Sequence, residues 1–168
     1  DDLDIVTLSH ICILGTICGN EEDVVTWISR KPALIPIRHC HSLTITSVAI
    51  LCRRRVIVQR CLMLDAGASA IQSVRGDSLF HLLATGFSNS DDSIATDMGL
   101  AGCNAAATHY NGWTPVSIAQ QSLMSVHGKI TTQLSAFSTL TAAIHRSDIL
   151  AGSISSSKAM NVNDQSTS

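Results

Sequence analysis

The chain has 168 residues, which suits one domain with its own hydrophobic core. Hydrophobic residues make up 45% of it, charged residues only 14%, and the net charge is −2. The longest apolar stretch, residues 5–18, is about fourteen residues long and contains Ser9 and His10, so it is too short for the roughly twenty residues of a membrane span.

Three further features of the sequence bear on the cellular compartment and on the origin of the chain. Acidic residues precede the apolar stretch, which is the wrong flank for a secretory signal. The six cysteines are expected to be reduced, and we therefore expect an intracellular protein, cytoplasmic or nuclear. Because the chain does not begin with methionine, we expect a fragment, a processed product or a trimmed sequence.

Residues 5–32 predict a first pair of helices. Apolar residues in 5–18 recur at three- and four-residue spacing, which is typical of a helix. Gly19-Asn20 breaks this helix, and Glu21, Glu22 and Asp23 then place acidic groups at the positive end of the next one. Lys31-Pro32 ends the pair.

Residues 43–70 predict a second pair. An apolar helix over 44–52 is followed by a turn at Arg53, Arg54 and Arg55, and then by a helix over 56–65. Gly67 is expected to cap this helix in the left-handed conformation that glycine allows. Cys52 and Cys61 occupy apolar helix positions, where a thiol acts as a small hydrophobe.

Two later stretches share one marker of a helix start. In Gly112-Trp113-Thr114-Pro115, Asn111-Gly112 is a tight-turn pair, Thr114 an N-cap and Pro115 the first helical residue. Gly76-Asp77-Ser78-Leu79, thirty-six residues earlier, has the same order of glycine, hydroxyl cap and apolar helix. These stretches predict a third unit over 76–105 and a fourth over 112–147.

Smaller features complete the two later units. The third unit has about three extra residues between its helices, within 87–92. The second helix of the fourth unit is expected near 129–146. Serine is frequent and aromatics are absent from residue 151 onward, so 151–168 is expected to be a disordered tail.

The markers resemble those of the ankyrin repeat family, whose units start with Gly-x-Thr-Pro-Leu-His-x-Ala and repeat at about 33 residues. Residues 64–84 and 98–121 carry the best matches, with a second glycine-containing marker ahead of each helix start. Both copies depart from the family pattern, since Ser117 replaces its His and Leu79 its Pro.

The resemblance implies an all-α helical repeat solenoid over residues 1–150, with about four degenerate helix pairs and short hairpin tips. It also implies a non-catalytic protein–protein interaction module or scaffold, which binds through the tips and the concave helix face. The partner would be another protein or another domain of a longer chain. No cofactor, metal or small-molecule substrate is implied.

Two groups of residues are candidates for the partner-binding surface. His109, Tyr110 and Trp113 fall at the tip between the third and fourth units, where exposed aromatics would anchor an interface; the alternative is packing on the next tip. Arg53, Arg54 and Arg55 lie in a basic middle region, 30–75, with eight bases and one acid. They would attract an acidic protein, or simply form a solvated turn. Nucleic acid is not expected, because no aromatic accompanies them.

Two chemical alternatives compete with this interpretation. Gly76-Asp77-Ser78-Leu79 spells the motif of the GDSL esterases, with Ser78 as nucleophile. The histidine partner of that family is missing, since Asp148 is followed by Ile-Leu-Ala. His39-Cys40-His41 suggests zinc, but the cysteines offer no paired spacing, so no metal site is expected. A third class is a fragment that caps or scaffolds a longer chain.

Overall fold

The computed structural model describes residues 4–70, 72–85 and 91–125. Within these ranges the chain forms seven α-helices and no strand, and one isolated antiparallel bridge joins Gln72 to Ser78. The predicted all-α class is therefore confirmed. None of the helices in these ranges combines the length and the apolar character that crossing a bilayer requires.

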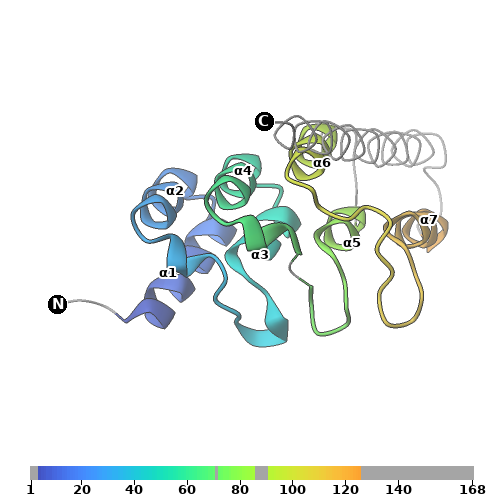
Figure 1. Ribbon diagram of the computed structural model, residues 1–168, viewed down its shortest axis with the longest axis horizontal. Coiled ribbons are helices and arrows are strands. Elements are labelled where there is room, and N and C mark those ends of the chain that lie inside the picture. The colour runs from blue at the N-terminus through green and yellow to red at the C-terminus, as the bar shows by residue number, and fades with distance from the viewer. Residues whose placement is uncertain (1–3, 71, 86–90, 126–168) are drawn as a thin grey trace, which may run out of the picture.

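The helices stand in two parallel rows (Figure 1). The first row holds α1 (Ile5–Cys18), α3 (Ile45–Leu51), α5 (Leu79–Ala84) and α7 (Pro115–Ser125), and the second holds α2 (Glu21–Arg30), α4 (Arg55–Leu64) and α6 (Asp92–Leu100). Each helix packs against its neighbour in the same row, and α1–α2 and α3–α4 also pack as pairs. The loops that join one pair to the next protrude on one side of the stack (Figure 1).

These pairs fall within the units expected at 5–32, 43–70 and 76–105. The insertion predicted within 87–92 lies largely outside the described residues. The helix near 129–146 and the tail at 151–168 lie wholly outside them.

Side-chain caps start the helices of the first row. The Asp4 carboxylate accepts hydrogen bonds from the Val6 and Thr7 amides at 2.8 and 3.1 Å. Thr44 Oγ1 accepts from the Ser47 amide at 3.3 Å, and Thr114 Oγ1 accepts from the Ser117 amide at 3.2 Å. These oxygens satisfy amides that have no partner within the helix. The predicted start at Thr114-Pro115 is confirmed.

Of the two helix ends predicted at a glycine, one agrees with the structure and the other differs. Gly19 has φ 87° and ends α1, as predicted from Gly19-Asn20. Gly67 is not left-handed, and α4 ends at Leu64 with Asp65 in an extended conformation. The prediction for Gly67 was wrong because the Asp65 carboxylate accepts the Gly67 amide at 2.8 Å and forms a different turn.

The core runs between the two rows and is built from small and branched side chains. All residues from Ile45 to Ile50 of α3 are buried, since this helix lies between α1 and α5. Cys61 is buried without a disulfide, as predicted for a small hydrophobe, whereas Cys52 is only partly buried. Cys12 of α1 is buried in the same way as Cys61. Burial raises the pKa of the Cys61 thiol to about 12, so it stays neutral.

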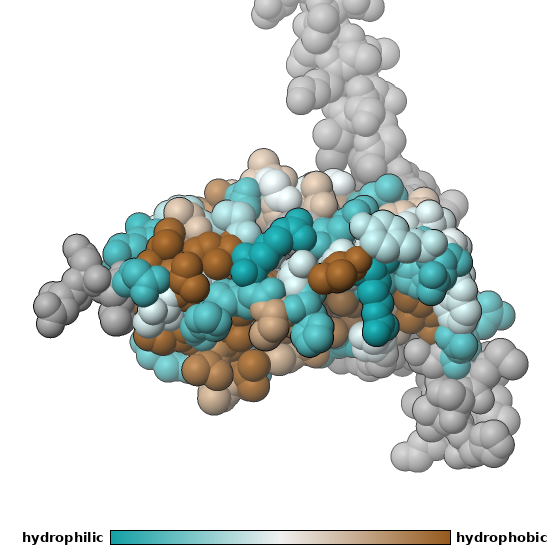
Figure 2. Space-filling view, turned by 90° about the horizontal axis from the view of Figure 1, so that it is seen from below, coloured by the Kyte–Doolittle hydropathy of each residue, from teal (hydrophilic) through white to brown (hydrophobic). Residues whose placement is uncertain are grey.

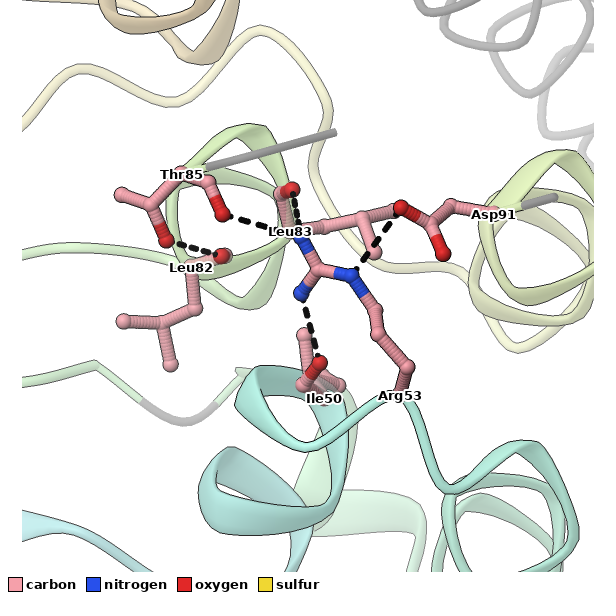
Figure 3. Close-up of polar contacts among 6 residues, drawn as sticks. All are labelled: Ile50, Arg53, Leu82, Leu83, Thr85 and Asp91. Atoms are coloured by element: carbon pink, nitrogen blue, oxygen red, sulfur yellow. Dashed lines mark hydrogen bonds and ion pairs between the residues drawn. The ribbon is translucent and has the colours of Figure 1, made fainter. Parts of the chain in front are cut away.

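Arg53 lies in the turn between α3 and α4 and contacts residues at the ends of α3 and α5 and at the start of α6 (Figure 3). Its guanidinium donates to the carbonyls of Ile50 at 2.7 Å, Leu83 at 3.1 Å and Thr85 at 2.9 Å. These carbonyls lie at the C-terminal ends of α3 and α5, where a cation is favourable. Its Nε pairs at 3.0 Å with Asp91, which directly precedes α6 and whose side chain is only 3% exposed.

We predict that Arg53→Gln lowers the free energy of unfolding by about 2–4 kcal/mol, because it removes the charge-assisted hydrogen bond between Arg53 and the buried Asp91 carboxylate. Urea denaturation measures the change. The matched control is Arg55→Gln, since Arg55 pairs with Asp97 but its own side chain is half exposed. Arg55→Gln should cost clearly less, and equal losses would contradict the role assigned to Arg53.

Candidate functional site

Two protruding loops repeat the same hydrogen bonds thirty-six residues apart. In the first, the Ser73 amide donates to the Asp77 carbonyl and the Gly76 amide to the Ser73 carbonyl, both at 3.0 Å. In the second, His109 donates to Trp113 at 3.0 Å and Gly112 to His109 at 2.8 Å. Gly76 and Gly112 both have φ 78°, which confirms the tight turn predicted at Asn111-Gly112. We call residues 73–77 and 109–113 the two tips.

The two tips are joined to each other. The Tyr110 amide donates to the Arg75 carbonyl at 3.1 Å. The Tyr110 ring lies across Gly76, where an added Cβ would come within 3.0 Å of ring atoms. Glycine is therefore required at position 76 both for its positive φ and for this close approach.

His81 connects the second tip to the helix row beneath it. Its Nδ1 accepts the Ser78 amide at 3.0 Å, so its proton is on Nε2, which donates to the Trp113 carbonyl at 2.9 Å. Its ring stacks on His109, and His109 stacks on Trp113. Burial lowers the pKa of His81 and keeps it neutral, although the Trp113 carbonyl acts in the opposite direction.

A groove of about 550 Å³ lies beside the tips, lined by residues of both tips and of α7. The aromatic residues Tyr110, His109 and Trp113 line it together with Val74, Arg75, Asp77 and Ile118. The Asp77 carboxylate accepts a hydrogen bond from the Ser73 hydroxyl at 2.7 Å. Tyr110 is 77% exposed. The Tyr110 hydroxyl, the Trp113 indole N–H and the Arg75 guanidinium make no hydrogen bond within residues 4–70, 72–85 and 91–125.

The structure brings together His109, Tyr110 and Trp113 as predicted, at the second tip. Arg53, Arg54 and Arg55 are elsewhere, in the turn between α3 and α4. Each of these arginines contacts another helix pair, although the Arg55 side chain remains half exposed. Besides the Arg53 contacts, Arg54 bonds the Thr16 carbonyl and pairs with Glu21, while Arg55 pairs with Asp97 at 2.7 Å.

Sequence reasoning missed Val74 and Arg75, which line the groove from the first tip. A signal for them was present, since they stand thirty-six residues before Tyr110 and Asn111. The repeat period applied to the tips, as well as to the helix starts, would have placed them on the same surface.

The Ser78 hydroxyl lies 2.8 Å from His81 Nδ1, the distance expected between a nucleophile and its base. However, the same nitrogen accepts the Ser78 amide, and the other ring nitrogen faces a carbonyl rather than a carboxylate. Ser78 and His81 are both buried. These contacts match the reciprocal bonds of a capping box.

A second serine–histidine pair lies in the first helix pair. Ser9 Oγ is 2.7 Å from His39 Nε2 and 3.4 Å from the Leu34 carbonyl. Ser9 is completely buried, so this pair links α1 to the loop that follows α2. Across the three described ranges, no group of three or more His, Cys, Asp or Glu side chains is placed to hold a metal ion.

No family model, no curated protein and no solved structure matches this chain. Its function therefore has to be inferred from its own residues.

We predict that Ser78→Ala lowers the free energy of unfolding by about 0.5–2 kcal/mol, since it removes a helix cap. Thermal or urea denaturation measures the loss. An assay of the same purified protein with short acyl esters tests whether Ser78 is instead the nucleophile of an esterase. Ester hydrolysis that disappears in a folded Ser78→Ala protein would make Ser78 a nucleophile.

The pKa of His81 also predicts a pH dependence of stability. Since its folded-state pKa lies below the unfolded value of about 6.5, the unfolded chain takes up the proton first as the pH falls. Its stabilising contribution is therefore complete above about pH 6.5 and is lost as the pH falls through the folded-state pKa.

The free energy of unfolding, measured by urea denaturation between about pH 7 and pH 5, should fall less steeply in His81→Ser than in the parent. Serine at this position can keep the cap, as Ser117 does for Thr114. Part of the slope should remain, because burial also lowers the pKa of His39. Identical slopes would contradict a buried neutral His81.

Proposed function

We propose that this chain is a non-catalytic module of the ankyrin type, which binds a segment of another protein, or of another domain of a longer chain, in the groove beside the two tips. The observation that carries the proposal is the pair of exposed aromatics, Tyr110 and Trp113, held on one tip beside the groove. Aromatic side chains with a polar end are the usual anchors of protein interfaces.

The repetition in the structure supports the ankyrin-type assignment. Hydroxyl caps at Thr44, Ser78 and Thr114 start successive helices of the first row, spaced 34 and 36 residues apart. The residue three positions after each cap is Ser47, His81 or Ser117, and each lies within hydrogen-bond distance of the cap hydroxyl. A period in this range, with short tips and paired helices, is typical of such solenoids.

The chemistry of the groove favours an extended segment with acceptor groups. Tyr110, Trp113 and Arg75 supply an O–H, an N–H and a guanidinium that the described residues leave unused. Carbonyl oxygens of an extended backbone can accept the first two, and a carboxylate can accept the third. Val74 and Ile118 provide apolar contact beside them. The acidic character expected of the partner is thus assigned to Arg75 rather than to Arg53, Arg54 or Arg55.

The contacts that position the tip support tight recognition. Tyr110 is positioned by its amide bond to Arg75 and by contact of its ring with Gly76, while the Trp113 backbone is bonded to His81. A surface that is ordered before binding loses less conformational entropy when a partner docks.

We predict that Tyr110→Ala weakens binding of a groove peptide by more than about 1 kcal/mol, because it removes the most exposed anchor. Peptides are first selected from a displayed random library with the parent chain, and their Kd values are then measured by fluorescence anisotropy of labelled peptide. Arg75→Gln should reduce the salt dependence of binding to acidic peptides.

Met63→Ala is the matched control, since Met63 is an exposed apolar side chain on α4, outside the groove. The Met63→Ala protein should bind the selected peptides with the same Kd as the parent. Selected peptides that bind Tyr110→Ala and the parent equally would rule out the groove as the binding surface.

A further inference from the structure

Helix α1 is apolar on the side that its neighbours leave uncovered. It contains no charged residue, and Ile11, Leu14 and Ile17 are 44%, 60% and 54% exposed. Their three-residue spacing places them on one face, centred on Leu14. We call these three residues the α1 face. Figure 2 shows apolar side chains gathered at this N-terminal end of the molecule, on the left of the view.

Helix α3, the next helix of the same row, shows that such an apolar composition suits a helix covered on two sides. Every residue of α3 from Ile45 to Ile50 is buried, because α1 packs on one side of it and α5 on the other. Helix α1 is similarly apolar, and among the described residues it packs mainly against α2, α3, the short turn Pro32–Leu34 and His39. The outermost helix of a solenoid that ends in solvent carries a polar outer face. The α1 face is instead that of an internal helix.

Carboxylates lie at both ends of the α1 face. Asp4 directly precedes α1, while Glu21, Glu22 and Asp23 follow shortly after its last residue, and His10 is the one basic residue of α1. A second copy of the chain placed face to face would bring these acidic groups together. The charge distribution therefore disfavours self-association and favours a partner with basic groups.

The contact on the covered side of α1 shows how such a partner can bind. Helix α3 packs on α1, and Arg54, shortly after the end of α3, bonds the Thr16 carbonyl at 3.3 Å and pairs with Glu21 at 3.5 Å. An apolar helix followed by a cation thus already satisfies the carbonyl end of α1 and one of its acidic neighbours.

We propose that the α1 face docks an amphipathic helix of a partner, with basic residues at the ends of its apolar stripe. The contact buries Ile11, Leu14 and Ile17 and pairs the basic residues with the carboxylates beside α1. This surface is on the first helix pair and does not include the groove residues Tyr110 and Trp113. It is therefore independent of the proposed function.

The test uses the full chain and two synthetic helices of about four turns with the same leucine stripe. One carries lysines at both ends of the stripe and the other carries glutamates. Fluorescence anisotropy of labelled peptide measures Kd. The lysine peptide should bind the parent at least about tenfold more tightly than the glutamate peptide, and more weakly as salt is raised.

Substitutions locate the bound peptide. Leu14→Ser should weaken binding of the lysine peptide at least about tenfold, and it should preserve the fold because Leu14 is exposed. Met63→Ser, which changes an exposed apolar side chain on α4, should bind as the parent does, and so should Tyr110→Ala.

Three results would overturn the proposal: no binding of the lysine peptide, equal binding of the two peptides, or Leu14→Ser binding like the parent. Sedimentation gives a fourth test. Self-association of the parent that Leu14→Ser abolishes would assign the α1 face to a second copy instead.

Discussion

Short helices create a constraint that the rest of this structure has to satisfy. Each helix leaves amides at its start and carbonyls at its end without intrahelical partners, and in a stack many of these groups are shielded from water. Here they are satisfied across the stack as well as locally. Arg53 takes up carbonyls from the ends of α3 and α5, and Arg54 takes up the Thr16 carbonyl near the end of α1. The same bonds therefore satisfy the helix ends and join one unit to the next.

This arrangement links the core to the proposed binding surface. His81 is a buried capping residue of α5, yet its second nitrogen bonds the tip that carries Tyr110 and Trp113. The first tip supports the second through the Arg75 carbonyl and through Gly76, whose lack of a side chain lets the Tyr110 ring pack against it. An aromatic pair on a loop is thereby held by two independent contacts, which is the preorganisation that the proposed recognition of a partner segment requires.

Local signals in the sequence were reliable where one residue decides the backbone. Thr114-Pro115 starts a helix and Gly19 ends one, because a hydroxyl cap, a fixed φ and a positive φ each act within a few residues. Gly67 shows the limit of this reasoning. A glycine after a helix permits a left-handed cap without requiring it, and the neighbouring Asp65 carboxylate selects another turn.

The sequence by itself determined the all-α class, the helix starts at the capped positions and the place of the aromatic tip, since each depends on short-range spacing. Only the tertiary structure decided which groups Arg53, Arg54 and Arg55 pair with. Their partners Asp91, Glu21 and Asp97 are distant in the chain, and the stacking of units brings them together. The sequence does not show which way a charged side chain points. The packing of neighbouring helices determines whether a cation is exposed to solvent or pairs with a buried carboxylate.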